Sequence, residues 1–177
     1  WLPWVAALEA ALDDNVVIAT DNAMCVYYGF IQNFTAHRPA SLHFPTGFGT
    51  LGFTVPAAIG AACAAPDRQV VGISGDGGLL FTVPELATAA AEQLPIAIVV
   101  FDNSGYGEIR NEMLDRGEQP VAVAAPPRDL VQIARGFGAA AALINTPEEL
   151  TAAVIAARSH PGPTVLVVPE ALREEEL

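Results

Sequence analysis

Residues 70–81 read VVGISGDGGLLF and join an apolar strand pattern to a glycine-rich loop. Residues 70–73 are apolar or glycine throughout, as expected for a strand that is buried on both faces of a sheet. The run ends at Ser74, and a single carboxylate, Asp76, then lies among three glycines. Glycine lets the backbone approach a ligand closely or adopt a positive φ. We therefore expect a buried strand whose end presents Asp76 to a ligand.

The same kind of strand recurs along the chain in alternation with helical patterns. Strand-like runs cover residues 16–20, 69–74, 95–101, 140–144 and 163–168, with a weaker one at 41–44, and helical patterns cover residues 1–12, 55–65, 84–93, 128–137 and 147–159. Thr146 before Pro147, with two glutamates next, is typical of a capped helix start. Alternating strands and helices predict an α/β fold: a doubly wound, about six-stranded parallel sheet with helices on both faces. We expect one domain over residues 1–177.

Composition excludes several classes of protein. The chain has eight Lys and Arg residues and 20 Asp and Glu residues, so its formal net charge is −12. This negative charge argues against nucleic-acid binding. The sequence contains no run of about 18 apolar residues, so we expect no membrane span. Cys25 and Cys63 show neither metal-site spacing nor a disulfide framework, so we expect a cytoplasmic protein. The chain opens directly in a helical pattern, which suggests a fragment of a longer protein, and Glu170 and the glutamates at 174–176 suggest a solvated tail.

Three loops carry most of the polar and glycine residues that could form a site. They are residues 44–52 (FPTGFGTLG), 74–79 (SGDGGL) and 102–110 (DNSGYGEIR). Each follows a predicted strand, and ligands of doubly wound sheets bind at the carboxyl ends of the strands. We therefore expect the three loops to form one site.

The first loop contains a glycine pattern that suggests a nicotinamide cofactor. Residues 47–52 match G-x-G-x-x-G, and Asp76 follows 24 residues after Gly52, as a ribose-binding acid would. Two features weaken this alternative. The preceding segment contains His43 and Pro45 and is a poor central strand. Asp76 also lies inside a glycine cluster, which a ribose contact does not require.

The second and third loops together predict a metal site. Between Gly77 and Asn103 lie 25 residues, enough for one helix and one strand, so the two loops follow neighbouring strands. Asp76 and Asn103 then point into one crevice. A carboxylate, an amide oxygen and a backbone carbonyl are hard ligands that suit Mg²⁺, which also shares phosphate oxygens. Free amides at Gly77 and Gly78 would face those phosphates. The loops therefore predict a Mg²⁺-diphosphate site.

The G-D-G sequence, followed by about 25 residues and Asn103, resembles the thiamine-diphosphate motif of the 2-oxo-acid decarboxylase and acetolactate synthase family. Residues 46–62 (TGFGTLGFTVPAAIGAA) and 85–89 (ELATA) resemble the family's segments before and after that motif. The resemblance covers nearly the whole chain. It implies the family's C-terminal, cofactor-binding domain.

The resemblance also implies a role for individual residues. Asp76 and Asn103 would bind Mg²⁺ through their side chains and Gly105 through its carbonyl. Leu51 would be the apolar wedge that bends the cofactor, and the Gly49 carbonyl would accept a hydrogen bond from the aminopyrimidine. The full set of implied cofactor contacts is Gly49, Leu51, Gly75, Asp76, Gly77, Gly78, Asn103, Gly105 and Tyr106, with Asn22 to Cys25 near the diphosphate, and the residues implied for catalysis are Leu51, Glu108 and Ile109.

The implied activity is decarboxylation of a 2-oxo acid with thiamine diphosphate and Mg²⁺. The GYGEI sequence at residues 105–109 is most similar to decarboxylases of guanidino 2-oxo acids, which suggests 5-guanidino-2-oxopentanoate as substrate. Acetolactate synthase-type carboligation is the alternative, and a non-catalytic remnant or a NAD-binding domain is a more distant one. The resemblance also implies a homo-oligomer in which the N-terminal, pyrimidine-binding domain of a neighbouring subunit completes the site.

Overall fold

The computed structural model describes residues 1–170, and within them it contains one six-stranded sheet whose neighbouring strands are all parallel. The spatial order is β2-β1-β3-β4-β6-β5. The strands are β1 (Val17–Thr20), β2 (Leu42–His43), β3 (Val70–Gly75), β4 (Ile96–Asp102), β5 (Ala140–Leu143) and β6 (Thr164–Pro169). The predicted doubly wound α/β fold is confirmed.

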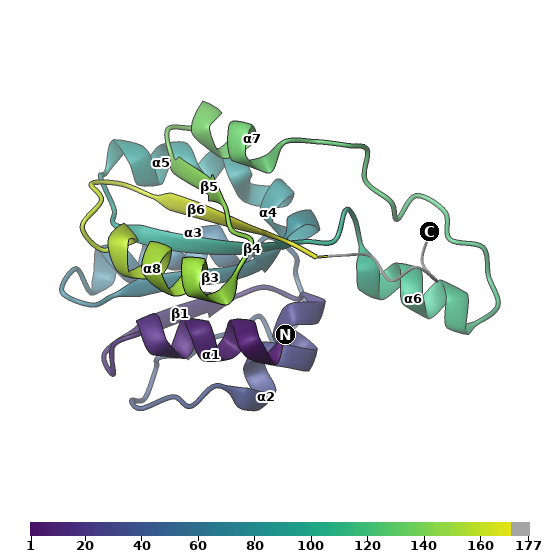
Figure 1. The fold of residues 1–177 in the computed structure, drawn as a ribbon, viewed down its shortest axis with the longest axis horizontal. Coiled ribbons are helices and arrows are strands. Elements are labelled where there is room, and N and C mark those ends of the chain that lie inside the picture. Colours follow the sequence, from purple (N-terminus) through teal and green to yellow (C-terminus); the bar gives the residue numbers. More distant parts are fainter. Residues whose placement is uncertain (171–177) are drawn as a thin grey trace.

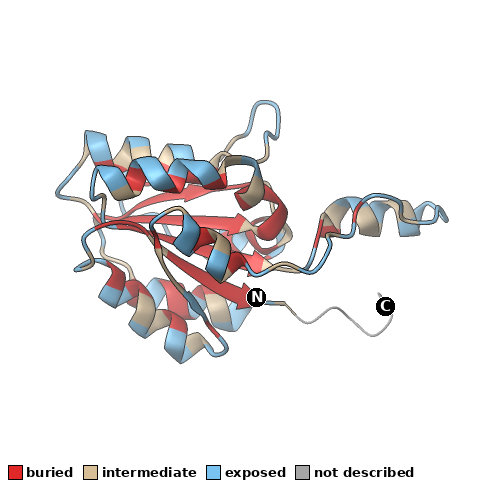
Figure 2. Cartoon of the chain, turned by 90° about the horizontal axis from the view of Figure 1, so that it is seen from above, coloured by how far each residue is buried: buried red, intermediate tan, exposed pale blue. Residues whose placement is uncertain are grey.

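Helices cover both faces of the sheet (Figures 1 and 2). One face packs against α1 (Leu2–Ala11), α8 (Pro147–Ala157) and the π-helix η1 (Cys25–Phe30), and the other against α3 (Thr54–Ala64), α4 (Asp76–Thr82), α5 (Leu86–Ala91) and α7 (Leu130–Gly136). The remaining helical segments are α2 (Ile31–Asn33), the 3-10 turn η2 (Val83–Glu85) and α6 (Gly107–Asp115). Two apolar cores result, and the central strands β3 and β4 separate them, which explains why both strands are almost entirely apolar.

Several helix boundaries differ from the sequence-based expectation. The helix expected at residues 84–93 is preceded by α4, which begins at Asp76 itself, and Pro84 lies in the 3-10 turn between α4 and α5. Proline has no N–H to donate, so it favours a break in the helical hydrogen bonding there. Gln93 has a positive φ of 52° and lies beyond the end of α5. The expected cap at Thr146 is confirmed, because its hydroxyl accepts a hydrogen bond from the Glu149 amide.

The chain between β4 and α7 forms an arm that stands away from the sheet. It contains α6 and a return segment, and both views show it projecting from the end of the body at which β4 terminates (Figures 1 and 2). The return segment pairs with the loop after β4, where the Tyr106 amide donates to the Val123 carbonyl at 2.8 Å and the Ala125 amide donates to the Ser104 carbonyl at 2.8 Å. The root of the arm is therefore fixed to the carboxyl end of the sheet.

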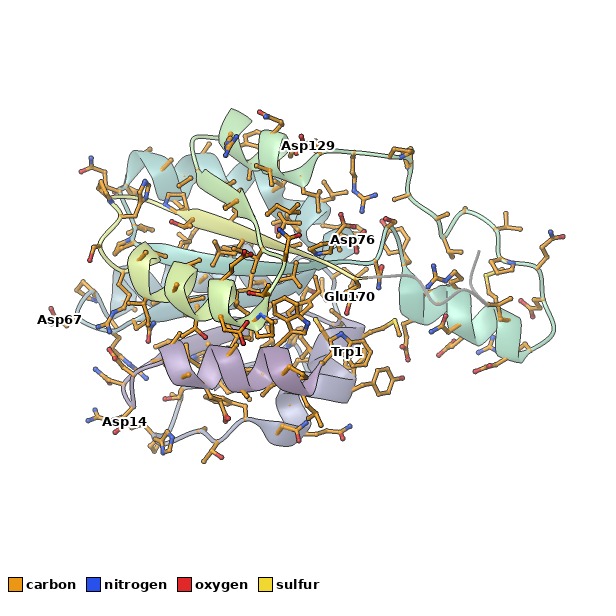
Figure 3. All side chains as sticks on the ribbon, in the orientation of Figure 1. Trp1, Asp14, Asp67, Asp76, Asp129 and Glu170 are labelled. Atoms are coloured by element: carbon orange, nitrogen blue, oxygen red, sulfur yellow. The ribbon has the colours of Figure 1, made fainter. Side chains whose placement is uncertain are left out.

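The expectation of a solvated acidic tail is wrong for Glu170. Its carboxylate accepts a hydrogen bond from the Trp1 indole N–H, and burial raises its pKa. Figure 3 shows Trp1, Glu170 and Asp76 at the end of the body that faces the arm, and Asp14 and Asp67 at the opposite end. The glutamates at 174–176 lie outside the described residues. None of the helices within residues 1–170 has both the length and the apolar character needed to cross a membrane.

Candidate cofactor and metal site

The order of the strands places the candidate site. The chain runs from β1 outward to β2 and then returns past β1 to β3, so the sheet changes direction between β1 and β3. Such a switch point opens a crevice at the carboxyl ends of the strands. A cavity of about 280 Å³ lies there, between the segments that follow β1, β3 and β4 and the loop before α3.

The eleven residues of the predicted cofactor, metal and catalytic set all line this cavity. They are Gly49, Leu51, Gly75, Asp76, Gly77, Gly78, Asn103, Gly105, Tyr106, Glu108 and Ile109. Asn22, Ala23 and Met24 also line it, as expected, whereas Cys25, which was expected near the diphosphate as well, is buried in the core and does not line the cavity. Tyr27 and Gly107 complete the lining and were not expected from the sequence. The structure thus brings the predicted residues together, and the role of each stays a prediction.

Asp76 is the buried charge of the site. It is the first residue of α4 and is 1% exposed. Its pKa is raised from 3.8 to about 6, mainly by burial and then by the nearby Asp102 charge, while the Arg128 guanidinium and the backbone amides of Gly77 and Gly105 oppose the shift by favouring the ionised form. Arg128 donates a hydrogen bond to Asp76 Oδ2 and lies 3.8 Å from Asp102 Oδ1. A buried carboxylate whose ionisation is costly is one that a cation can stabilise strongly.

Three polar groups converge in front of the metal loop, residues 102–110. The Asn103 side-chain amide lies 3.2 Å from Asp76 Oδ1 and 3.0 Å from the Gly105 carbonyl oxygen. With its nitrogen toward these two oxygens, the amide donates a hydrogen bond to both. With its oxygen toward them, all three groups present oxygen atoms that a cation between them could bind. The donor set is hard and contains one charge, which fits Mg²⁺ that also binds phosphate oxygens and water. Within residues 1–170 there is no cluster of three His, Cys, Asp or Glu side chains that could hold a metal.

The glycines around Asp76 are required by close approaches. A Cβ atom on Gly77 would lie 2.8 Å from the Tyr106 ring, and one on Gly78 would lie 2.8 Å from Asp21 Oδ2. At Gly105, where φ is 155°, a Cβ atom would lie 2.2 Å from the Val123 carbonyl oxygen. A side chain at Gly77 would push the start of α4 away from Tyr106, and one at Gly78 would push it away from Asp21. A side chain at Gly105 would push the metal loop away from the return segment at Val123. The glycines therefore keep the carbonyl and amide groups of these loops exposed to the cavity.

The Leu51 loop is held by a residue that the sequence did not single out. Asp21, which is fully buried at the end of β1, accepts hydrogen bonds from the Gly52 amide at 2.9 and 3.1 Å and from the Asn22 amide at 2.9 Å. Burial raises its pKa, and these hydrogen bonds oppose that shift. The Thr82 hydroxyl donates to the Gly52 carbonyl at 2.9 Å. These contacts fix Leu51 at the rim of the cavity.

Two tyrosines of η1 contact residues of the cavity, and Tyr27 itself lines it. The Tyr27 hydroxyl donates to Asn22 Oδ1 at 2.8 Å, and the Tyr28 hydroxyl donates to Glu108 Oε1 at 2.6 Å. The hydrogen bond to Glu108 is the main cause of a raised Tyr28 pKa. One carboxylate oxygen of Glu108 therefore already accepts a hydrogen bond, from Tyr28. The neighbouring Ile109 is half-exposed. No sequence pattern predicts η1, because its aromatic residues follow no helical apolar pattern.

The nicotinamide alternative finds no support in this geometry. The strand before Gly47 is the two-residue edge strand β2 rather than a central strand. Asp76 faces the metal loop and Arg128. Asp76 follows the strand after the glycine-rich loop, but β1 separates β2 from β3, whereas the corresponding two strands of a dinucleotide-binding unit are neighbours.

Comparisons with known proteins agree with the geometry. Residues 24–168 match the family model for the thiamine pyrophosphate enzyme, C-terminal TPP binding domain. The chain is 36% identical over 166 residues to the acetolactate synthase isozyme 1 large subunit of Escherichia coli K12, covering 93% of this chain and 29% of that protein. It is 37% identical over 144 residues to the probable 2-ketoarginine decarboxylase AruI of Pseudomonas aeruginosa, covering 81% and 25% of the two chains.

A solved structure shows the same fold. The thiamine diphosphate-dependent 4-hydroxybenzoylformate decarboxylase of Rhodococcus jostii RHA1 superposes with a TM-score of 0.86 at 31% identity, over 98% of this chain and 33% of that one. The chain thus spans about a third or less of the length of these relatives. It belongs to the thiamine pyrophosphate enzyme family and forms the C-terminal, TPP-binding domain of that family.

Proposed function

We propose that this chain is the cofactor-binding domain of a longer thiamine-diphosphate- and Mg²⁺-dependent lyase that decarboxylates 2-oxo acids. The observation that carries the proposal is the convergence of the Asp76 carboxylate, the Asn103 amide and the Gly105 carbonyl in the cavity that Leu51 also lines. These are the ligands that a Mg²⁺ ion bridging to a diphosphate needs. Relatives named as decarboxylases, at 31–37% identity, support the reaction class.

Different residues along the cavity would bind the metal and different parts of the cofactor. Asp76, Asn103 and Gly105 would hold the metal, and the amides of Gly77 and Gly78 would contact the diphosphate. Leu51 and the Gly49 carbonyl, on the loop that Asp21 fixes, would hold the aminopyrimidine end. Gly75 and Tyr106 would contact the cofactor between these groups. Bound thiamine diphosphate supplies the electron sink for loss of CO₂.

We further propose that the substrate has a cationic, guanidinium tail. Glu108 lines the cavity next to the metal loop, and Tyr28 engages only its Oε1 atom. A guanidinium could pair with the remaining carboxylate oxygen through a charge-assisted hydrogen bond, which pyruvate cannot form. A relative of 37% identity is named as a probable 2-ketoarginine decarboxylase. Ile109 would contact the aliphatic part of the same substrate.

The substrate proposal is tested by Glu108→Gln in the full-length protein. We expect kcat/KM for 5-guanidino-2-oxopentanoate to fall about a hundredfold, because a charge-assisted contact is lost, and kcat/KM for pyruvate to change little. Glu112→Gln is the matched control, since Glu112 lies one turn further on α6 and pairs with Arg116 at the surface. Equal losses for both substrates, or a wild type that prefers pyruvate, would refute the proposed tail.

Carboligation of the acetolactate synthase type is the second candidate reaction. It is favoured by the 36% identity to the Escherichia coli acetolactate synthase subunit. The two reactions are separated by product: a decarboxylase releases one aldehyde per CO₂, whereas the synthase joins two 2-oxo acids with loss of one CO₂. A non-catalytic remnant would bind neither cofactor nor substrate.

The site in this proposal is completed by another domain. Phe48, at the tip of the Leu51 loop, is fully exposed, and Phe81 and Ile109 are at least half-exposed. Exposed apolar side chains around a cavity are typical of an interaction surface. We propose that the N-terminal, pyrimidine-binding domain of a neighbouring subunit covers them in a homo-oligomer. Free Cys25 and Cys63 fit a cytoplasmic location for that enzyme.

A further inference from the structure

Arg128 joins the metal site from a part of the chain that no motif includes. Its guanidinium donates to Asp76 Oδ2, and its Nη2 atom lies 3.8 Å from Asp102 Oδ1. The Arg128 side chain is 12% exposed and the Asp76 side chain 1% exposed. Ion pairs with so little solvent around them hold their partners in a defined orientation far better than surface pairs do.

The two oxygens of Asp76 face different partners. Asp76 Oδ2 accepts the hydrogen bond from Arg128. Asp76 Oδ1 lies 3.2 Å from the Asn103 side-chain amide, which also lies 3.0 Å from the Gly105 carbonyl oxygen. A carboxylate is planar, so fixing one oxygen fixes the direction of the other. We infer that Arg128 is a positioning residue for the metal: it orients Asp76 so that Oδ1 is presented to the cation together with Asn103 and Gly105. This inference rests on the proposed function of the site.

An alternative role for Arg128 is that of a competitor, a cation that must leave before the metal enters. The charges around it favour the positioning role. Asp76 and Asp102 carry two negative charges against one guanidinium, so the cluster keeps a net charge of −1 with Arg128 in place. The oxygen that the metal would use is not the oxygen that Arg128 occupies. Arg128 and a divalent cation can therefore bind Asp76 at the same time.

The backbone of Arg128 is held by a packed helix. The next residue, Asp129, caps α7, and its side chain accepts a hydrogen bond from the Gln132 amide at 2.9 Å. Leu130 and Ala134 of α7 are 2% and 0% exposed in the core. Arg128 thus lies two residues before a packed helix that anchors the chain beside it, while residues 116–122 of the arm are largely exposed. Positioning of a metal ligand requires such a fixed support.

The test measures the affinity of the full-length protein for Mg²⁺ at saturating thiamine diphosphate, by titration calorimetry. We expect Arg128→Gln to weaken Mg²⁺ binding about 10- to 100-fold, the range found when an outer partner of a metal ligand is removed. Arg128→Lys keeps the charge without the planar fork and should lie between Arg128→Gln and wild type. Arg135→Gln is the matched control. Arg135 lines the neighbouring cavity with Arg128 but bonds only the Ala141 carbonyl, so its loss should leave Mg²⁺ binding within about twofold.

A second readout separates positioning from general support of the fold. A rigid ligand set discriminates Mg²⁺ from the larger Ca²⁺, and a loosened one does so less. We therefore expect Arg128→Gln to lower the ratio of Mg²⁺ to Ca²⁺ affinity, a change that the lower melting temperature expected on breaking a buried ion pair would not by itself produce. Should Arg128→Gln not fold, Arg128→Lys carries the same two measurements.

Three results would overturn the inference. Tighter or unchanged Mg²⁺ binding in Arg128→Gln would make Arg128 a competitor or a bystander. Equal losses of affinity for Mg²⁺ and Ca²⁺ would make it a support of the fold alone. Wild-type protein that binds no thiamine diphosphate with Mg²⁺ would remove the proposed function, and the inference with it, before any variant is compared.

Discussion

Replacement of Asp21 tests whether the Leu51 loop is held from β1. Asp21 is fully buried and accepts hydrogen bonds from the backbone amides of Gly52 and Asn22. Asp21→Ala leaves both amides without their acceptor. Each buried, unsatisfied amide costs about 1–3 kcal/mol, so we expect a loss of about 2–6 kcal/mol of unfolding free energy.

The isosteric change Asp21→Asn refines that estimate. Asparagine keeps one acceptor oxygen but turns a donor toward one of the two amides, so about 1–3 kcal/mol should be lost. Asparagine is also neutral, and it escapes the burial cost that raises the Asp21 pKa. For a domain of this size, 1–3 kcal/mol corresponds to a fall of about 2–12 °C in melting temperature.

The assay is thermal unfolding followed by circular dichroism. Thiamine-diphosphate affinity is measured on the same samples at about 20–25 °C, roughly the temperature to which the expected losses of unfolding free energy refer. We expect both Asp21 variants to melt earlier and to bind the cofactor more weakly, because the Leu51 loop loses its anchor. Asp14→Asn is the control, since Asp14 is exposed at the opposite end of the molecule (Figure 3). An Asp21→Ala protein that melts with wild type and binds the cofactor normally would refute the anchoring role.

The remaining predictions concern the metal loop and the domain as a whole. The raised pKa of Asp76, about 6, means that its protonated form stabilises the cation-free fold at low pH, and that this contribution is lost as pH rises from about 3.8 to about 6. Because Mg²⁺ needs the ionised carboxylate, Mg²⁺ affinity should fall about tenfold per pH unit below about pH 6 and should not change with pH above it. An affinity that stays constant down to about pH 5 would contradict this prediction. Gly105→Ala should weaken Mg²⁺-dependent cofactor binding at least about tenfold, because the added Cβ would lie 2.2 Å from the Val123 carbonyl oxygen; normal binding in calorimetry would show that the loop tolerates it. Residues 1–177 alone should not decarboxylate 2-oxo acids, because the cavity is uncovered, and steady CO₂ release by the purified domain would count against a second domain in the site.

The sheet and the pairing of Asp76 with Asn103 could be predicted from sequence for a physical reason. Strands buried on both faces must be apolar on both sides, so β3 and β4 are visible as unbroken apolar runs. One helix and one strand separate the two polar residues, and successive strands of this kind lie side by side. The cavity contains both residues as a result.

Other parts of the site depend on contacts that sequence patterns do not encode. Arg128 and Asp76 are 52 residues apart, and their contact requires the arm to leave the sheet and return to the same strand end. From sequence, Arg128 is only the start of an expected helix. Asp21 likewise is one carboxylate after a strand until the Gly52 loop folds over it. The boundary of α4 at Asp76 was missed because Gly77 and Gly78 are poor helix formers, and close packing against Tyr106 and Asp21 favours them there.

The proposed role of Asp76 is to hold a Mg²⁺ ion that binds the diphosphate of the cofactor. Binding of thiamine diphosphate to the full-length protein, measured with and without Mg²⁺ in wild type and in Asp76→Ala, tests this role. We predict saturable, Mg²⁺-dependent binding by the wild type and none by Asp76→Ala at the same concentrations, with Asp14→Ala behaving as wild type. Mg²⁺-dependent binding of equal affinity in Asp76→Ala, or wild-type binding that is indifferent to Mg²⁺, would show that Asp76 does not hold such an ion.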